Sequence, residues 1–339
     1  MLAARVGKQR VLLAERPVPR VPEGWALIRV RLAGICNTDL EILRGYHNFH
    51  GTLGHEFVGQ VAACGGAGAV RNRAERRWLG RRVAGEINIT CRGLGKPHCG
   101  FCRRGMTTHC SRRRVLGILG HDGAFAEYLT LPIGNLHLVP DGIPDECAVF
   151  TEPLAAACRI LEQVPAARNT PVAVLGDGKL GQLIVRVLAA SGARVTLFGR
   201  HPEKLQLAAG RGVSTSLLRP GTGRPGSRVP GRFPMVVDAT GSPQGIQQAV
   251  WLTEPGGTLV VKSTFHGAAR LETWPIVVDE MTLVGSRCGP FERALELLGS
   301  RRVDPRPLIS RVYSLRAAAA AIRAARSPGV LKILLDPRG

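Results

Sequence analysis

"VAVLGDGKLGQL", residues 172–183, passes from an apolar run through a glycine-rich turn into residues with helical spacing. Gly176, Gly178 and Gly181 have the spacing G-x-G-x-x-G, with Lys179 and Leu180 between the last two glycines. Between a strand and a helix, these glycines permit a tight turn, close approach of a pyrophosphate to the backbone, and close packing of the helix on the strand. The N-terminus of the following helix also attracts phosphate. The stretch therefore predicts a turn that binds a dinucleotide.

On both sides of this turn, short apolar strands alternate with helical segments. The expected strands are residues 170–176, 193–199, 234–241 and 256–264, and the expected helices are residues 179–192 and 246–253. Alternation of this kind indicates a parallel sheet whose two faces are both covered by helices. The region from 154 to 286 is therefore expected to be a doubly wound nucleotide-binding domain of Rossmann type.

The remainder of the chain has a different texture. Short strands punctuated by proline and glycine are expected at residues 10–18, 25–34 and 124–132, as in an all-β unit. Residues 328–337 are expected to add a closing strand near the C-terminus. We therefore expect an α/β protein of two domains, with residues 1–153 and 287–339 forming a β-rich domain and residues 154–286 the nucleotide-binding domain.

Composition limits the class of protein. The 339 residues are 45% hydrophobic, which is enough for two packed cores and excludes global disorder. The start of the chain has no secretory pattern and no run is long enough to span a membrane, so a cytoplasmic protein without a membrane partner is expected.

The chain is strongly basic, with a formal net charge of +21, and only six of its 46 basic residues are lysine. The densest stretch runs from Arg71 to Arg82. A basic surface favours polyanions, but aromatic residues make up only 5% of the chain, which is poor for stacking on bases. A solvated arginine-rich surface is therefore favoured over a nucleic-acid partner.

Four of the nine cysteines lie within a 20-residue window, as Cys91-x7-Cys99-x2-Cys102-x7-Cys110. The central C-x2-C pair can bind one ion through a tight turn, and the outer two cysteines complete four thiolates, the closed set of a structural zinc site. Neighbouring arginines are expected to lower the thiolate pKa values. The alternative is four free thiols in a loop.

A second set of metal-ligand residues is scattered along the chain. It comprises Cys36 in "AGICNTDLEI", the adjacent His55 and Glu56 in "GTLGHEFVGQV", and Glu152 in "FTEPLAAAC". His55 and Glu56 are either a buried hydrogen-bonded pair or ligands of a metal. An open catalytic zinc site needs three protein ligands, and this set is large enough to supply them.

The order of these motifs resembles the zinc-dependent medium-chain alcohol/polyol dehydrogenases, and in particular the polyol and glucose dehydrogenase branch, over essentially the whole chain. The resemblance implies a GroES-like catalytic domain and a zinc ion held by Cys36, His55 and a carboxylate. Glu152 is the expected third ligand, directly or through water, and Glu56 is expected to bind or release the metal as substrate enters. Asp39 is expected to fix the His55 tautomer, with Thr38 accepting the substrate proton. For Glu152 the alternative is a carboxylate stabilised by a helix N-terminus.

Two features depart from the family pattern. Seven residues separate Cys91 from Cys99 where the family usually has two, so Cys91 is the least secure of the four ligands. Glu41 stands where some alcohol dehydrogenases have a relay histidine. A proton relay is then expected to run through Thr38, the cofactor ribose and water.

The end of the strand at 193–199 bears on cofactor choice. An NAD enzyme would carry an acid there for the ribose 2′-hydroxyl, but this chain has Gly199, Arg200 and His201. Glycine leaves room for a 2′-phosphate, with which Arg200 and Lys204 can pair, so NADP is predicted in preference to NAD. In the alternative, Glu203 reaches the ribose and NAD is the cofactor.

Two further strand ends are expected to line the cofactor crevice. Their residues are Thr240, Gly241, Lys262, Ser263 and Thr264.

The predicted function is reversible hydride transfer between a secondary alcohol, in a polyol or sugar, and the nicotinamide, with two zinc ions per chain. A homodimer or homotetramer is expected. One alternative is a metal-free NADPH-dependent reductase of the quinone type, which would have no use for Cys36, His55 and Glu152 together. The other is a basic, zinc-stabilised nucleic-acid-binding protein, which leaves the glycine-rich turn unexplained. His47 and His50 are expected either to line the substrate pocket or to lie on the surface.

Overall fold

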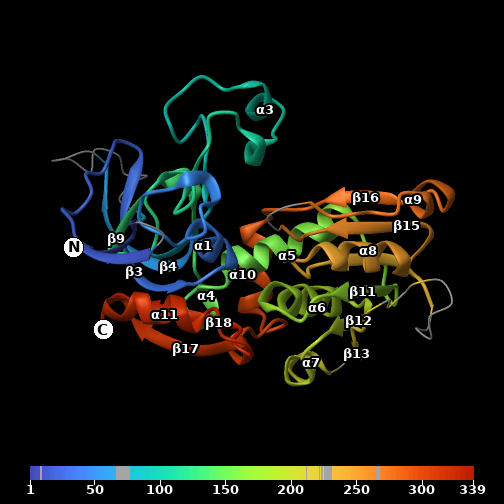
Figure 1. Ribbon diagram of the computed structural model, residues 1–339. Coiled ribbons are helices and arrows are strands. Elements are labelled where there is room, and N and C mark those ends of the chain that lie inside the picture. Colours follow the sequence, from blue (N-terminus) through green and yellow to red (C-terminus); the bar gives the residue numbers. More distant parts are fainter. Residues whose placement is uncertain are drawn as a thin grey trace. The chain divides into compact units, whose positions relative to one another are not determined.

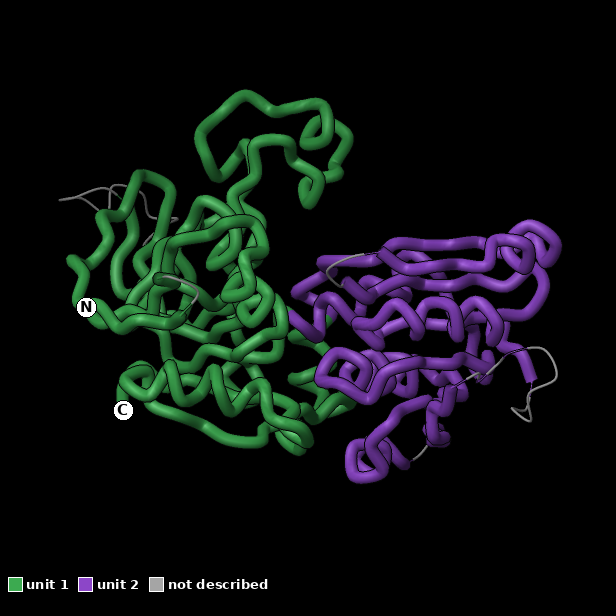
Figure 2. The backbone as a smooth tube through the Cα atoms, viewed as in Figure 1, with its two compact units in different colours: residues 1–152, 294–339 green, residues 153–293 purple. Residues whose placement is uncertain are grey.

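The structure is a computed structural model that describes residues 1–7, 10–65, 77–210, 212–220, 222, 224, 231–264 and 268–339. Residues 71–76 of the arginine-rich stretch lie outside the described residues. The chain forms two compact units, Met1–Glu152 with Ala294–Gly339 (unit 1) and Pro153–Arg293 (unit 2), shown in Figure 2. The boundaries expected from the sequence, after residue 153 and before residue 287, stay predictions.

Unit 1 is built on a seven-stranded sheet in the order β10-β5-β4-β3-β18-β17, with β9 also paired to β3. Its strands are β3 (Trp25–Gly34), β4 (Glu56–Cys64), β5 (Arg82–Gly85), β9 (Tyr128–Pro132), β10 (Leu136–Leu138), β17 (Ile309–Ser314) and β18 (Lys332–Asp336). Side chains alternate between buried and less buried positions along the first half of β3, as expected where one face of a sheet covers a core. The closing strand β18 thus joins a sheet made mostly of N-terminal residues.

Smaller elements complete unit 1 (Figure 1). They are the hairpin of β1 (Leu2–Gly7) and β2 (Arg10–Glu15), and the three-stranded sheet of β6 (Asn88–Ile89), β7 (Arg114–Leu116) and β8 (Gly120–His121). The helices are α1 (Asn37–Ile42), α3 (Gly100–Arg103), α4 (Asp145–Ala148) and α11 (Ala318–Ala324). Single 3-10 turns lie at Tyr46–Asn48, Thr107–His109, Ile133–Asn135, Arg306–Leu308 and Leu315–Ala317. Two helices, α5 (Thr151–Gln163) and α10 (Phe291–Gly299), contain the points where the chain passes between units.

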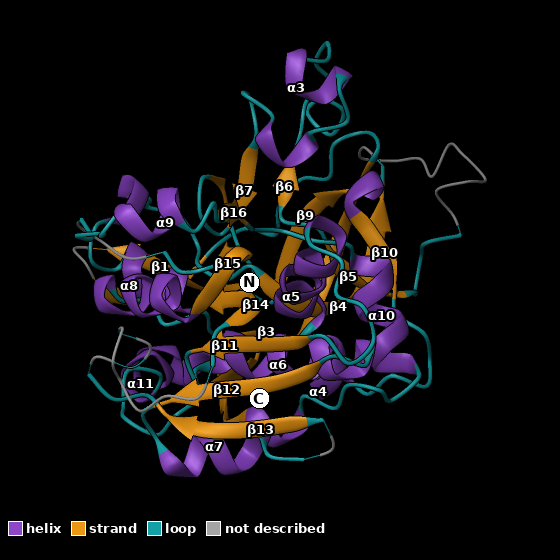
Figure 3. Cartoon of the chain, turned by 90° about the vertical axis from the view of Figure 1, so that its right-hand side faces the viewer, coloured by secondary structure: helices purple, strands orange, loops and turns teal. Residues whose placement is uncertain are grey.

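Unit 2 is a six-stranded parallel sheet in the order β13-β12-β11-β14-β15-β16, which can be followed in Figure 3. The strands are β11 (Pro171–Leu175), β12 (Arg194–Gly199), β13 (Val213–Leu217), β14 (Phe233–Asp238), β15 (Thr253–Val261) and β16 (Thr282–Gly285). The helices are α6 (Lys179–Ser191), α7 (Pro202–Ala208), α8 (Pro243–Leu252) and α9 (Trp274–Val278). The expected α/β fold, a β-rich domain plus a Rossmann-type parallel sheet, is confirmed.

The core of unit 2 explains why its strands read as continuous apolar runs. Four of the five residues of β11 are fully buried, because this central strand has neighbours on both edges and helices over the sheet. Ala173, Leu175, Phe198, Val236 and Leu259 come together in one cluster under α8. The strand order also reverses at β11, with β12 on one side and β14 on the other. In open α/β sheets, such a reversal leaves a ligand crevice beyond the carboxyl ends of the strands.

Among the described residues, no helix combines the length and the apolar character that crossing a bilayer requires.

Candidate active site

Cys36, His55 and Glu56 gather at one place in unit 1. The cysteine sulfur, a histidine ring nitrogen and a carboxylate oxygen all lie within 4.8 Å of one another. Cys36 directly precedes α1, and His55 and Glu56 stand at the start of β4. His55 and Glu56 are buried, whereas Cys36 is partly exposed. The three potential ligands therefore form a group that is closed on one side and accessible at Cys36.

Asp39 holds this group together. Its carboxylate accepts the Cys36 N–H at 2.8 Å and the Gly54 N–H at 3.2 Å. The same carboxylate lies 3.4 Å from Nδ1 of His55, too long for a hydrogen bond but close enough for electrostatic attraction. One buried carboxylate thus joins the segment before α1 to the segment before β4. Because Nδ1 faces Asp39, the other ring nitrogen, Nε2, is the one available to a metal.

The charges around His55 suit a cation. Burial disfavours the charged imidazole, but the Asp39 carboxylate and the Cys36 side chain outweigh burial and raise the His55 pKa well above its usual value. The buried Asp39 carboxylate therefore already attracts positive charge to this point. A zinc ion fits this donor set of sulfur, nitrogen and oxygen, and would displace the proton from the ring.

Glu56 has a second partner that the sequence did not reveal. Its carboxylate forms a fully buried ion pair with the ammonium group of Lys332, 276 residues away in the chain. Burial opposes the charged form of Lys332, yet the carboxylate of Glu56 and the side chain of Cys36 raise its pKa, so the lysine is charged. Gly34 makes the pairing sterically feasible, because a Cβ there would overlap with the Glu56 carboxylate. A lysine directly before three apolar residues of the closing strand is the sequence signal for this buried pair.

Three further residues named in the sequence analysis, Glu152, Thr38 and Glu41, have separate surroundings. Glu152, in the first turn of α5, does not belong to the cluster of potential ligands found among the described residues, although its charge acts on Lys332. Its role as third ligand stays a prediction. The Thr38 hydroxyl lies 3.8 Å from the Cys36 sulfur. Glu41, at the relay position, pairs with Arg44 at 2.6 Å.

Two exposed histidines, His47 and His50, lie on the 46–50 segment. His47 packs on Tyr46, with 4.1 Å between ring centroids. His50 lines a cavity of about 460 Å³ in unit 1, together with Arg5, His121 and Asp122. Cys36 and His55 do not line this cavity, so His50 contributes to a space separate from the candidate metal ligands.

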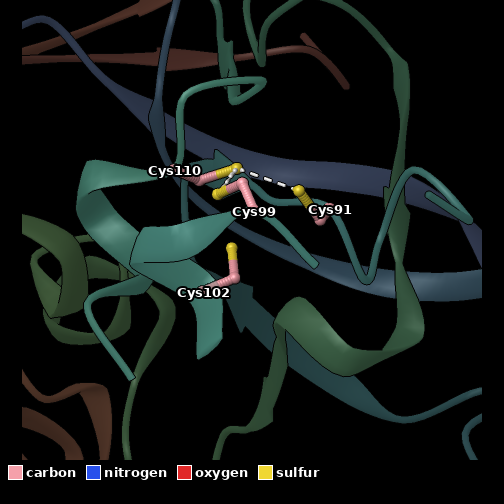
Figure 4. A group of neighbouring side chains, drawn as sticks. All are labelled: Cys91, Cys99, Cys102 and Cys110. Carbon is pink, nitrogen blue, oxygen red and sulfur yellow. Dashed lines mark hydrogen bonds between the residues drawn. The ribbon is translucent and has the colours of Figure 1, made fainter. Parts of the chain in front are cut away.

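The four cysteines of the 91–110 segment converge (Figure 4). Their sulfur atoms all lie within 4.8 Å of one another, with Cys91 and Cys110 only 3.5 Å apart. Cys91 and Cys110 are buried, and α3 places Cys99 and Cys102 one helical turn apart. Cys91 joins the cluster despite the long spacing, because residues 91–95 form a turn of their own before Cys99. The set fits a tetrahedral ion such as zinc.

The Cys99 and Cys102 thiols have opposite pKa shifts with different causes. The N–H groups of Cys102 and Ser111 donate to the Cys99 sulfur and lower its pKa to about 5. Burial and the neighbouring sulfurs raise the pKa of Cys102 to about 12. The expected arginine effect is therefore not the main cause: Arg103 donates to the His98 carbonyl, and Arg104 lies over Phe101. Four sulfurs this close can all ionise only around a cation.

The glycine-rich turn of unit 2 has the geometry expected of a phosphate-binding turn. Gly176 has a φ of 111°, and a Cβ there would overlap with the Ala239 carbonyl. A Cβ on Gly181 would overlap with the Gly176 carbonyl. Gly178, just before α6, has open space at the corresponding position, which leaves its backbone accessible to a pyrophosphate. Lys179 and Leu180 stand in the first turn of α6, next to this opening.

The carboxyl ends of β14 and β15 form the other side of the crevice. The Thr240 hydroxyl donates to Asp238 at 2.8 Å, and the Gly241 N–H donates to the Ser263 hydroxyl at 2.8 Å. Thr264 is exposed just beyond Ser263. The Lys262 ammonium donates instead to the carbonyls of Ala156 and Arg287. The ammonium of Lys262 is therefore hydrogen-bonded within unit 2. A contact between the cofactor and the Lys262 backbone stays a prediction.

The turn after β12 is held by an unexpected carboxylate from the glycine-rich turn after β11. Asp177, between Gly176 and Gly178, accepts the N–H groups of Arg200 at 2.6 Å and His201 at 2.8 Å. A Cβ on Gly199 would overlap with this carboxylate. The space that glycine provides at 199 is thus occupied by Asp177, not left open for a phosphate as the sequence suggested. The acid inside the G-x-G motif, combined with a glycine at the strand end, was the available signal.

Comparison with known protein families gives the same assignment for both regions. Residues 22–141 match the alcohol dehydrogenase GroES-like domain, and residues 180–300 match the zinc-binding dehydrogenase family. A D-altritol 5-dehydrogenase of Agrobacterium fabrum is 30% identical over 308 residues, 88% of this chain and 83% of the relative. Galactitol 1-phosphate 5-dehydrogenase of Escherichia coli is 27% identical over 347 residues, 96% of this chain and 97% of the relative.

Solved structures agree over the whole length. A zinc-binding dehydrogenase from Sinorhizobium meliloti with NADP bound is 29% identical, with a TM-score of 0.86 and 99% of each chain covered. An Escherichia coli alcohol dehydrogenase with NADH bound is 26% identical, with a TM-score of 0.87 and 99% of each chain covered. These relatives support a dehydrogenase over both the metal-free reductase and the nucleic-acid-binding protein. The chain belongs to the zinc-dependent medium-chain dehydrogenase family, whose members are NAD(P)-linked alcohol oxidoreductases.

Proposed function

We propose that the protein reversibly oxidises a secondary alcohol of a polyol or sugar. The observation that carries this proposal is the convergence of Cys36, His55 and Glu56 within 4.8 Å, with Cys36 accessible. Relatives named as acting on sugar alcohols or sugar acids, such as L-galactonate-5-dehydrogenase and D-altritol 5-dehydrogenase, support the substrate class.

The residues of unit 1 have distinct roles in this proposal. Zinc bound at the group would supply Lewis acidity toward the alcohol oxygen, and the nicotinamide cofactor would supply the hydride acceptor. Thr38, with its hydroxyl 3.8 Å from the Cys36 sulfur, accepts the alcohol proton beside the metal ligands. Asp39 keeps the Cys36 and His55 segments in register, so that little reorganisation is needed when substrate binds. Glu152 is retained in this proposal as a ligand through water.

Measuring the rate of nicotinamide reduction with a panel of C4 to C6 polyols, sugar acids and simple secondary alcohols tests this function. We expect turnover with at least one polyol or sugar derivative, and a weaker response to simple alcohols of the same chain length. Equal rates with all secondary alcohols would contradict the polyol assignment, and no turnover with any of them in zinc-loaded protein would contradict the activity itself.

We also propose two zinc ions per chain, one at Cys36, His55 and a carboxylate and one at the four cysteines. The four sulfurs leave no position for substrate, so the second ion is structural. Thiolates that must remain reduced in order to bind metal also support a cytoplasmic location, which cell fractionation would test.

The preferred cofactor in this proposal is NADP. Arg200 is exposed and, within the described part of the chain, its guanidinium has no partner. Lys204 is 92% buried by residue area, and its ammonium likewise has no hydrogen-bond or ion-pair partner in the described ranges. Two unpaired cations one helical turn apart suit a phosphate monoester. Glu203, the acid of the alternative, also lies in this turn.

Replacing Arg200 with alanine should lower kcat/KM for NADP by about tenfold to a hundredfold while leaving kcat/KM for NAD nearly unchanged. A hydrogen bond to a charged group contributes about 1.5–3 kcal/mol, and 1.4 kcal/mol is tenfold. Arg194→Ala, at the opposite end of β12, is the matched control and should change neither value. A wild-type preference for NAD would overturn the proposal.

For the assembly, we propose a homodimer, alone or as half of a tetramer. The edge strand β16 has one unpaired side, and β16 and the adjacent α9 expose Trp274, Val277, Val278 and Leu283, with Val277 74% exposed. An unpaired edge beside an apolar surface suits a second copy related by two-fold symmetry. Light scattering of wild type should give twice or four times the chain mass, and Val277→Glu should halve the measured mass. A monomeric wild type contradicts this assembly.

A further inference from the structure

Asp177 connects the two turns that face the crevice of unit 2. The residue belongs to the glycine-rich turn after β11, but its hydrogen-bond partners belong to the turn after β12. Its carboxylate accepts two backbone N–H groups and lies 3.0 Å from Nδ1 of His201 through each of its oxygens. The Asp177 side chain is only 9% exposed. The path of the backbone from Gly199 to His201 is therefore set by one buried carboxylate.

Gly199, on the other side of this contact, lacks the side chain that the Asp177 carboxylate would exclude. Any side chain at position 199 would overlap with the carboxylate, so Gly199 is required by Asp177 and not by an incoming ligand. The side chains of Arg200 and His201 then leave the turn in directions that the hydrogen bonds fix. Because His201 uses Nδ1 toward Asp177, its second nitrogen, Nε2, is the free polar atom of a ring that remains 42% exposed.

Two cationic side chains remain unpaired around the turn, and the imidazole of His201 keeps one ring nitrogen without a partner among the described residues. The two cations are the guanidinium of Arg200 and the ammonium of Lys204, whereas the Asp177 carboxylate is already surrounded by donors. Glu203 also lies in this turn, in the first turn of α7. A phosphate monoester has a second pKa of about 6, and the hydrogen bond from Nε2 to a phosphate oxygen needs one proton, which the monoester or the solvent supplies. The set thus fits a 2′-phosphate better than a pair of ribose hydroxyls.

We propose that Asp177 is the positioning residue for NADP recognition: it holds the 199–201 turn and the His201 imidazole so that Arg200, His201 and Lys204 surround the 2′-phosphate. This inference rests on the NADP preference proposed above and adds to it the element that organises the site. Asp177 acts through the turn and the imidazole and does not touch the phosphate itself.

The charge of Asp177 and its hydrogen bonds have opposite effects on NADPH binding, so a measured change in Kd distinguishes between them. Its negative charge repels a phosphate, so removing the charge alone would tighten NADPH binding. Its hydrogen bonds organise the cations, so removing them would weaken NADPH binding. Asp177→Asn keeps the size of the side chain but loses the charge and one acceptor oxygen. The direction of the change in Kd therefore reports which effect dominates.

Dissociation constants for NADPH and NADH, measured by nucleotide fluorescence on the full-length zinc-loaded protein, give the readout. Asp177→Asn should raise Kd for NADPH at least about tenfold and change Kd for NADH by no more than about twofold, with kcat at saturating NADP unchanged. Adenosine 2′,5′-bisphosphate should lose affinity in parallel, while adenosine 5′-phosphate should not. His201→Ala should weaken NADPH binding, and adding Asp177→Asn to it should have a smaller further effect than Asp177→Asn has alone.

Glu86→Gln provides a matched control, because Glu86 makes a similar contact to His137, at 3.2 Å, within unit 1. Glu86→Gln should leave the dissociation constants for NADPH, NADH, adenosine 2′,5′-bisphosphate and adenosine 5′-phosphate unchanged. Tighter NADPH binding by Asp177→Asn, or an equal loss of NADPH and NADH binding, would overturn the inference. A selective loss of NADH binding would also overturn it, because Asp177 would then be a ligand of the ribose hydroxyls. The preference of the wild type tests the NADP proposal separately, since it is measured without any substitution.

Discussion

Cys36→Ala should lower turnover at least about a thousandfold and reduce the zinc content from about two ions per chain to about one. Cys36 supplies the accessible sulfur of the group that also contains His55 and Glu56. Losing the Lewis acid removes several kcal/mol of transition-state stabilisation, and a thousandfold corresponds to about 4 kcal/mol. Metal analysis of untagged protein purified without chelator, followed by steady-state kinetics, measures both quantities.

Nucleotide binding should survive this change, since the glycine-rich turn lies in unit 2 and Cys36 in unit 1. Cys147→Ala is the matched control, because Cys147 is a buried cysteine of unit 1 that belongs to neither cysteine-containing group. It should retain both zinc ions and its turnover. Cys99→Ala should remove the other ion and lower thermal stability. Full turnover by Cys36→Ala would refute the catalytic centre, and a wild type with no zinc even after zinc is supplied would refute both sites.

Lys332→Met should destabilise unit 1 by about 3–5 kcal/mol, the range found when one partner of a buried ion pair is removed. Methionine nearly preserves the volume of the stem, so the expected loss arises from leaving the Glu56 carboxylate without its partner at a site where both side chains are only 2% exposed. Urea unfolding at matched zinc content measures the change in the free energy of unfolding. The exposed Lys96 provides the control, because Lys96→Met leaves no buried charge behind.

A double variant separates the ion pair from the stem. Adding Glu56→Gln to Lys332→Met removes the stranded charge and should recover part of the lost stability, so the two changes are not additive. A loss below about 1 kcal/mol for Lys332→Met, or full additivity of the two changes, would show that the pair does not stabilise the fold. Glu56→Gln alone should also be destabilising, because it leaves the ammonium buried and unpaired.

Local patterns in the sequence were sufficient for the fold class and for the clustering of four cysteines. In unit 2, apolar runs, glycine positions and periodicity, each of which acts over a few residues, predict the strands β11, β12, β14 and β15 and the helices α6 and α8. The edge strands β13 and β16 and the short helices α7 and α9 were not predicted. The spacing Cys99-x2-Cys102 similarly specifies a tight turn within one short helix. The longer spacing between Cys91 and Cys99 did not keep Cys91 out of the cluster, because the residues after Cys91 form a turn of their own.

Only the tertiary structure determines which groups pair with the buried charges. Gly34 in β3 is paired with Leu334 of β18 on one side and with Glu56 of β4 on the other, so sheet register brings Lys332 next to Glu56. In the same way, the parallel pairing of β11 with β12 brings Asp177 under Gly199. Glycine-rich motifs and cysteine spacing could be read from the sequence because their geometry is local. The pairing of a buried charge depends on register between distant strands, and one residue of slip would send each side chain to the opposite face.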